Sequence, residues 1–171
     1  MAAECRSPPT VPGERPASAC STVAGMTESS LAQPSAIHHV RLTVTDIARS
    51  RAFYRSLLGV DPAVDYSSQV DEPGVREDPA RLVGGCVFPV GDQLVGLRPV
   101  AATGEVFEST RVGLDHLCLA VAAVEDLHAA AARLDDAGVA HGAVTELDGF
   151  GLAILSVQDP DDINLELAAR V

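Results

Sequence analysis

Apolar and polar residues alternate in two similar stretches of the chain, and each stretch continues into a segment with helical spacing. The first stretch begins at Ile37 and reads IHHVRLTVTDIARSRAFYRSLLGV; the second begins at Leu114 and reads LDHLCLAVAAVEDLHAAAARLDDAGV. Alternation predicts a strand with one buried face, and apolar residues three or four positions apart predict an amphipathic helix. Both helices are expected to end at a glycine, Gly59 or Gly138. A strand–helix unit is therefore predicted twice.

Shorter apolar stretches follow each helix. In the first half we expect a helix capped by Asp46, a weak strand over 60–67, a polar loop over 68–81, and a hairpin of strands 82–90 and 93–98. In the second half we expect strands over 114–121, 139–144, 152–157 and 163–167, a helix over 124–137, and a turn over 159–162. The order is βαβββ twice, which predicts an α+β domain of two tandem βαβββ modules.

The N-terminal segment differs in composition from the rest. Residues 1–35 are rich in Pro, Ser, Thr and Ala, which predicts a disordered tail or, because Met26 would make a sensible start, a misplaced start codon. Residues 36–171 are expected to form a single domain, with module one over 37–98, a linker over 99–112 and module two over 113–168. No continuous apolar stretch resembles a secretion signal or a membrane span.

Net charge limits the expected binding partners, and the cysteine pattern limits the expected compartment. The formal net charge of −12 argues against nucleic acid and anionic membrane surfaces, although local arginines would still permit a small anionic substrate. The four cysteines, Cys5, Cys20, Cys86 and Cys118, form no CxxC pair, which favours reduced thiols in a cytoplasmic protein.

His39 and His116 occupy matching positions of the two stretches, 77 residues apart. Successive strand residues point to opposite faces, so the apolar residues of each strand should lie under the helix and the residues between them should face away. The residues expected to face away include His39, Arg41, Gly96, Arg98, His116, Cys118, Asn164 and Glu166. This set favours a cupped mixed sheet that surrounds a ligand, with the helices on its outer face.

Two imidazoles and one carboxylate would form a facial triad of His39, His116 and Glu166, typical of non-haem Fe(II), that leaves metal positions open. A single strand histidine is more often structural, but two at matched positions with a nearby carboxylate favour a metal site. Arg41 and Arg98 would clamp a substrate carboxylate or phosphate, with an ordinary solvated arginine as the alternative.

Asn164 lies on the same inward face and is a further candidate for substrate binding. His38 is expected to point to the helix side, and His141 is at most a substrate contact near the rim of the cup. No residue is assigned a catalytic role.

Three stretches carry a family resemblance: HHVRLTVTDIARSRAFYRSLLG at 38–59, GLDHLCLAV at 113–121 and DPDDINLEL at 159–167. They resemble the vicinal oxygen chelate superfamily, which includes glyoxalase I, extradiol dioxygenases, bleomycin-resistance proteins and fosfomycin-resistance thiol transferases. The resemblance covers 36–169 and is specific for the fold, whereas the reactions of the superfamily differ widely.

The resemblance implies one metal ligand from the first strand and one from the last strand of each module. In this chain these positions hold His39, His116 and Glu166, and aligning 92–97 with 162–167 places Gly96 where the fourth ligand would be. The four-ligand pattern of glyoxalase I is therefore incomplete, which argues against glutathione-dependent isomerisation.

The function implied is that of a divalent-metal-dependent enzyme acting on a small oxygenated substrate. Fe(II) is the first expectation, which would allow ring-cleaving dioxygenation, and Mn, Zn, Ni or Co would also accept these ligands. The alternatives are a metal-dependent thiol transferase or isomerase, and a non-enzymatic drug- or metabolite-binding protein. A homodimer is expected, with the site either within one chain or shared between two.

Overall fold

The chain folds into two βαβββ modules, each with its own four-stranded sheet and one α-helix. The computed structural model describes residues 31–171, and the fold lies within 36–171. Module one contains β1 (His39–Thr43), α1 (Ile47–Leu58), β2 (Val64–Asp65), the 3₁₀ turns η1 (Ser67–Gln69) and η2 (Pro79–Gly84), β3 (Cys86–Val90) and β4 (Gln93–Arg98). Module two contains β5 (Leu117–Ala120), α2 (Val124–Ala137), β6 (Thr145–Leu147), β7 (Leu152–Gln158) and β8 (Asn164–Arg170). The prediction of a disordered tail falls largely on residues 1–30, outside the described part.

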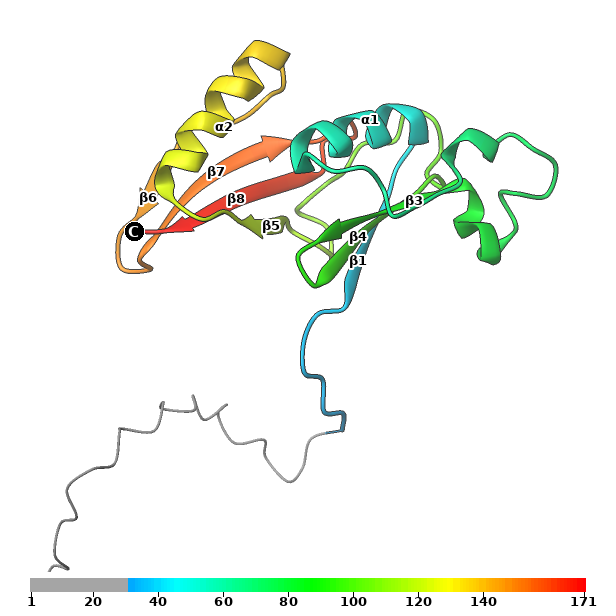
Figure 1. Cartoon of the computed structure of the whole chain (residues 1–171), viewed down its shortest axis with the longest axis horizontal. Coiled ribbons are helices and arrows are strands. Elements are labelled where there is room, and N and C mark those ends of the chain that lie inside the picture. The colour runs from blue at the N-terminus through cyan, green and yellow to red at the C-terminus, as the bar shows by residue number, and fades with distance from the viewer. Residues whose placement is uncertain (1–30) are drawn as a thin grey trace, which may run out of the picture. The chain divides into compact units, whose positions relative to one another are not determined.

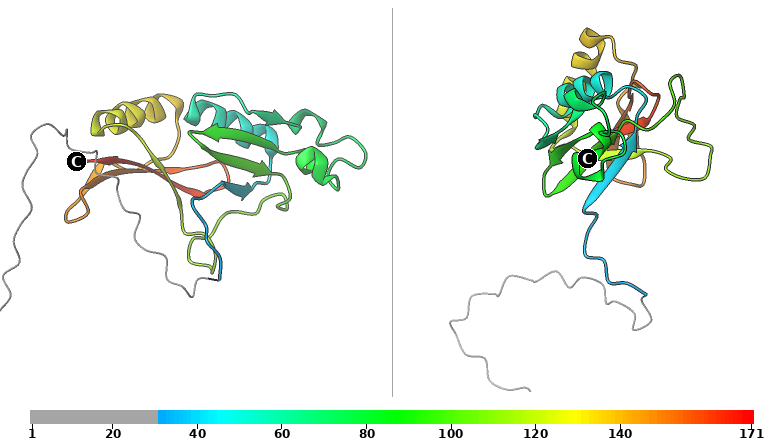
Figure 2. Two further views of the ribbon diagram at one scale, coloured as in Figure 1. Left: turned by 60° about the horizontal axis from the view of Figure 1, so that its bottom comes forward. Right: turned by 90° about the vertical axis from the view of Figure 1, so that its right-hand side faces the viewer.

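The two sheets have the same topology. Their strand orders are β1-β4-β3-β2 and β5-β8-β7-β6. The first strand of each module pairs in parallel with the last, and the other pairs are antiparallel. In Figures 1 and 2, α1 lies over the strands of module one and α2 over those of module two. The α+β fold of two tandem modules is confirmed.

Both helices begin and end where the sequence signals indicated. The Asp46 side chain accepts a hydrogen bond of 3.1 Å from the N–H of Arg49 and caps α1. Gly59 follows α1 with φ 68°, and Gly138 follows α2 with φ 66°. A glycine is favoured at these positions because the left-handed backbone has no steric cost without a Cβ.

Module one departs from prediction in the segment between α1 and β4. The expected strand 60–67 is reduced to Val64–Asp65, because Pro62 cannot donate to a ladder. The expected loop 68–81 contains part of two 3₁₀ turns, and the expected strand 82–90 begins only at Cys86. Leu82 and Val83 take left-handed backbone angles, with φ 52° and 54°, and close η2 instead of extending the strand.

Module two departs from prediction in two strands. The expected strand 114–121 is shorter, and β5 covers only Leu117–Ala120, so His116 lies immediately before it. The expected strand 139–144 is absent, and β6 lies at Thr145–Leu147. In the segment between α2 and β6, the chain contacts β7 only through one isolated bridge, from His141 to Val157. This segment is too irregular to form a ladder.

The hydrophobic core lies between each sheet and its helix. Its fully buried large side chains include Tyr54, Phe88, Leu97, Leu127, Leu155 and Leu165. Cys86 and Cys118 form no disulfide with each other, and Cys5 and Cys20 lie outside the described residues. No helix of residues 31–171 is long and apolar enough to span a membrane.

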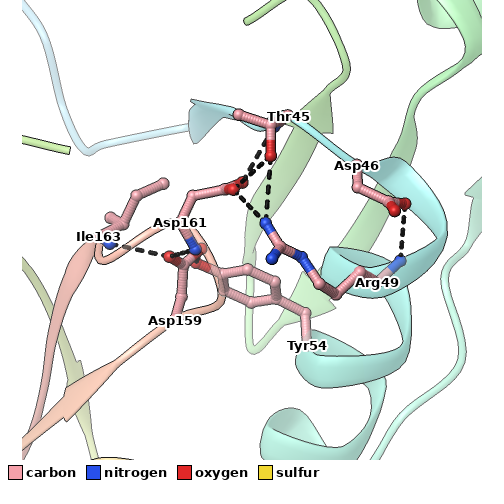
Figure 3. A network of polar contacts seen from close by, with 7 residues as sticks. All are labelled: Thr45, Asp46, Arg49, Tyr54, Asp159, Asp161 and Ile163. Atoms are coloured by element: carbon pink, nitrogen blue, oxygen red, sulfur yellow. Dashed lines mark hydrogen bonds and ion pairs between the residues drawn. The ribbon is translucent and has the colours of Figure 1, made fainter. Parts of the chain in front are cut away.

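The turn between β7 and β8 joins module two to module one (Figure 3). Asp161 Oδ2 accepts a hydrogen bond of 3.0 Å from the backbone N–H of Thr45. Its Oδ1 accepts from the Thr45 hydroxyl and from the Arg49 guanidinium, both at 2.5 Å. The Asp161 side chain is only 5% exposed, so these contacts satisfy a carboxylate that is almost shielded from water.

Asp159 provides the second buried carboxylate of this turn. Its Oδ1 accepts from the backbone N–H groups of Asp161 and Ile163, each at 2.8 Å, and its Oδ2 accepts from the Tyr54 hydroxyl at 3.1 Å. Burial raises the pKa of Asp159 despite these donors. Burial, together with the negative charge of Asp159, also raises the pKa of Tyr54, so the phenol stays protonated and donates.

We predict that Asp161→Asn lowers the free energy of unfolding by about 1–3 kcal/mol, because the amide loses the Arg49 ion pair and places a donor against Thr45. The matched control is Asp162→Asn, at an exposed neighbour with φ 61°, a backbone that asparagine also tolerates. The control should stay within about 0.5 kcal/mol of the parent in urea unfolding. Equal losses in the two variants would contradict the junction role of Asp161.

Candidate functional site

The faces turned away from the helices carry the candidate residues as the alternation indicated. In β8, Leu165 and Leu167 are buried, whereas Asn164 and Glu166 are half-buried on the opposite face. In β4, Val95 and Leu97 are buried under the helix and Arg98 is exposed. The candidate residues of both modules therefore lie on the inward faces of their sheets.

His116 and Glu166 lie together in module two. His116 Nε2 is 3.4 Å from Glu166 Oε2, with the two side chains 41% and 23% exposed. Cys118 in β5, two positions after His116, pairs directly with Glu166 in β8. An imidazole nitrogen and a carboxylate oxygen at this separation are close enough to ligate one ion with small side-chain adjustments.

Asp115 holds the imidazole of His116. Its Oδ1 is 2.8 Å from His116 Nδ1, and this hydrogen bond is the main cause of the raised pKa of His116. Because Nδ1 faces Asp115, Nε2 is the ring nitrogen that faces Glu166. A carboxylate bound to the second nitrogen is the usual support for a metal-ligating histidine. Asp115 was not predicted as a site residue, although its position directly before the candidate ligand His116 could have indicated this contact.

His39 has a similar support in module one. Its Nδ1 lies 2.9 Å from Nδ1 of His38, so one ring donates to the other. His38 is exposed and contacts His39 edge-on, which corrects the expectation that it points to the helix side. His38 and Asp115 stand at matching repeat positions, and each contacts the ring of the histidine that follows it.

The structure does not gather the three predicted ligands within one chain. Among residues 31–171, no group of three His, Cys, Asp or Glu side chains is placed to hold a metal ion. His116 and Glu166 lie 3.4 Å apart, and His39 does not form such a group with them. We refer to the His116–Glu166 pair as the candidate half-site.

The strand register agrees with the alignment that opposes Gly96 to Glu166. Arg41 pairs with Gly96 between β1 and β4, and Cys118 pairs with Glu166 between β5 and β8. Arg41 and Cys118 are 77 positions apart, as are His39 and His116. Module one therefore offers no side chain at the position that carries the carboxylate in module two.

The predicted substrate-binding residues lie in different surroundings. Arg41 and Arg98 are exposed on the inward face of module one, one strand apart. The Asn164 amide donates to the backbone carbonyl of Asp115 at 3.4 Å, and this contact helps to hold the segment that precedes His116. Two cavities, of about 610 and 590 Å³, lie elsewhere, and neither is lined by His39, His116 or Glu166.

The family is shown by comparison with known proteins. The family model described as the Glyoxalase/Bleomycin resistance protein/Dioxygenase superfamily matches residues 36–167, and the chain belongs to this superfamily. A comparison with curated proteins found no match.

Solved structures show the same fold. A glyoxylase/bleomycin resistance protein/dioxygenase domain from Frankia sp. EAN1pec is 29% identical, with 83% of this chain and 94% of that chain covered and a TM-score of 0.62. A lactoylglutathione lyase from Agrobacterium tumefaciens is 19% identical, with coverages of 80% and 94% and a TM-score of 0.56. A fosfomycin resistance protein from Listeria monocytogenes is 14% identical, with coverages of 81% and 96% and a TM-score of 0.59.

His141 has two hydrogen-bond partners of its own, away from the candidate ligands. Its Nδ1 lies 2.7 Å from the carbonyl oxygen of Gly142, and its Nε2 lies 3.1 Å from Asp135 Oδ1 at the end of α2. Both partners accept hydrogen bonds, so the doubly protonated ring is favoured and the pKa of His141 is raised above its ordinary value of 6.5. The ring therefore connects α2 to the segment that leads into β6.

We predict that His141 stabilises the fold at low pH. A raised pKa in the folded state gives stability that is fully present below about pH 6.5 and is lost as the pH rises through the folded-state pKa. Asp135→Asn should flatten this part of the melting-temperature profile between about pH 5.5 and 8.5. The matched control Asp136→Asn, at the exposed neighbour, should keep the parental profile. Identical profiles for the two variants would show that the Asp135 contact does not contribute to the pH dependence.

Proposed function

We propose that this protein is a divalent-metal-dependent enzyme that acts on a small oxygenated substrate. The metal would be held by His39, His116 and Glu166, with the site assembled from two copies of the chain. The observation that carries the proposal is the His116–Glu166 pair, whose nitrogen and oxygen lie 3.4 Å apart while Asp115 holds the far side of the imidazole.

The donor set suits a catalytic rather than a purely structural ion. Two imidazoles and one carboxylate leave coordination positions open for water and substrate, and Fe(II) is the metal most typical of this set. When bound, the metal would supply Lewis-acid chemistry at two adjacent substrate oxygens and, in the case of Fe(II), redox chemistry toward dioxygen. Ring-cleaving dioxygenation is therefore the first reaction to test, ahead of isomerisation, which the glycine at position 96 disfavours.

The residues around the half-site define what the chain itself contributes. Asp115 orients the His116 ring, and Glu166 supplies negative charge beside it. Leu152 and Ile154 lie along the same face of β7 and are half-buried, so they offer an apolar wall to a small substrate. Ser156 pairs with Glu166 across β7 and β8 and would place a hydroxyl between this wall and the ligands.

A second copy of the chain would complete the site. Within residues 31–171 His39 is not gathered with the other two ligands, and the junction of Asp159 and Asp161 with α1 holds the modules in this arrangement. In a twofold dimer, each copy would give its His39 to the His116–Glu166 pair of the other. The two sites would be equivalent, and each would take its module-one face from one chain and its module-two face from the other.

We predict that the parent protein, purified anaerobically and supplied with Fe(II), binds about one metal ion per chain. His39→Ala, His116→Ala and Glu166→Ala should each lower the metal content at least about tenfold without loss of fold, since each removes one of three ligands. Elemental analysis measures the metal, and circular dichroism reports the fold.

The matched control for this series is His128→Ala, at an exposed histidine on α2. Its metal content should equal that of the parent. A parent protein that takes up no Fe, Mn, Zn, Ni or Co would overturn the proposed function and favour a non-enzymatic binding protein. Full metal content in any one ligand variant would remove that residue from the site.

We predict that mixing two inactive variants restores metal binding. His39→Ala and Glu166→Ala, unfolded and refolded together, would form mixed dimers in which one of the two sites has no substitution. Random pairing should recover about a quarter of the parental metal content, whereas each variant refolded alone recovers none. As a control, the chain that carries both His39→Ala and Glu166→Ala should recover no metal binding after the same refolding. No recovery in the mixture would contradict a site that is shared between two chains.

A further inference from the structure

Arg41 lies beside Gly96, the inward position of β4 that has no side chain. It pairs with Gly96 between β1 and β4, and its own side chain folds over that residue. A Cβ at position 96 would lie 3.3 Å from Cγ of Arg41 and 3.5 Å from its Nε. Glycine at this position therefore makes room for the stem of the arginine, and this leaves the guanidinium against the inward face of the sheet.

The same place in module two carries the opposite charge. Arg41 and Gly96 correspond in the repeat to Cys118 and Glu166, which form the equivalent cross-strand pair. Where module two presents a carboxylate beside His116, module one presents a guanidinium beside the strand position of His39. The two differences from module two, arginine at position 41 and glycine at position 96, are linked. The absence of a side chain at position 96 leaves room for the Arg41 stem.

The Arg41 guanidinium has no acidic partner within residues 31–171. Five other arginines form ion pairs with carboxylates, namely Arg49, Arg51, Arg55, Arg76 and Arg81. Arg41 forms none and is exposed, in a chain with a formal net charge of −12. A guanidinium that remains unpaired in so acidic a protein, on the face that carries the candidate ligands, is available for an anion from solution.

We propose that Arg41, seated over Gly96, is an anion-binding subsite that selects substrates carrying a carboxylate or phosphate group. The proposal rests on the proposed metal site and names the class of substrate for it. Arg41 lies two positions along β1 from His39, which separates their Cα atoms by about 7 Å. The substrate would then carry its anionic group a few bonds away from the two oxygens that face the metal.

The test compares two ligands that differ only by a carboxylate. Catechol and 3,4-dihydroxybenzoate share the same vicinal oxygens, and their dissociation constants are measured on Co(II)-loaded protein from the visible spectrum. The parent should bind the carboxylated ligand about tenfold more tightly, as expected for a charged hydrogen bond to arginine. Arg41→Gln should abolish this preference without changing the metal content, and Arg41→Lys should keep part of it.

Two further variants sharpen the comparison. Gly96→Ala keeps the charge but pushes the Arg41 stem aside, so it should weaken the preference with unchanged metal content. Arg133→Gln, at an exposed arginine on α2, is the matched control and should behave as the parent. Equal binding of the two ligands by the parent, or a preference that survives Arg41→Gln, would overturn the subsite. Loss of metal or of dimer in Arg41→Gln would also overturn it, since Arg41 would then pair with Glu166 of the closed site.

A metal-free measurement separates this proposal from the proposed function. Titration with inorganic phosphate should shift the Nε–H resonance of Arg41 in the NMR spectrum and leave that of Arg133 in place. If the parent takes up no metal but the Arg41 signal shifts, the proposed function fails and the anion subsite stands. If the parent takes up metal, but Arg41→Gln keeps the carboxylate preference and phosphate does not shift the Arg41 resonance, the subsite fails and the metal site stands.

Discussion

Two buried carboxylates on one turn determine how the modules of this chain meet. A carboxylate removed from water is costly unless donors replace its hydration, and both acids obtain theirs from defined groups. Asp159 takes two backbone N–H groups of its own turn and the Tyr54 hydroxyl, and Asp161 takes Thr45 and Arg49 of module one. Because the donors to Asp161 lie where β1 leads into α1, the turn docks at one place and in one orientation.

The same turn sets the position of the half-site. Asp159 fixes the N–H of Ile163, the residue before β8, and the pairing of β8 with β7 runs from there with Glu166 opposite Ser156. A slip of one residue would turn Glu166 to the helix side and Leu165 to the inward face. The turn that joins the modules thus also fixes the face on which the candidate carboxylate meets His116.

Local patterns predicted the helices and the strand faces, because capping residues, glycines and alternation act over a few positions. The same signals failed at Leu82 and Val83, where an apolar run closes a turn with left-handed backbone instead of starting a strand. The aspartates of the β7–β8 turn looked like ordinary turn residues. Their contacts with Thr45 and Tyr54 join segments more than 100 residues apart, and no periodicity carries that information. Nor does periodicity show that His39, His116 and Glu166 form no three-residue group among residues 31–171.

In the proposed dimer, the difference between the two modules would favour contact between unlike faces. A site formed from two module-two faces would bring two Glu166 carboxylates together in a chain that already carries a net charge of −12, and like charges at short range repel. A site formed from one face of each kind would bring only one Glu166 carboxylate to the metal, with the His39 imidazole of the other face beside it. The difference between Gly96 and Glu166 would thus favour contact of a module-one face with a module-two face in the proposed dimer. Gly96 would then contribute twice, by making room for the Arg41 stem and by leaving module one without a second carboxylate.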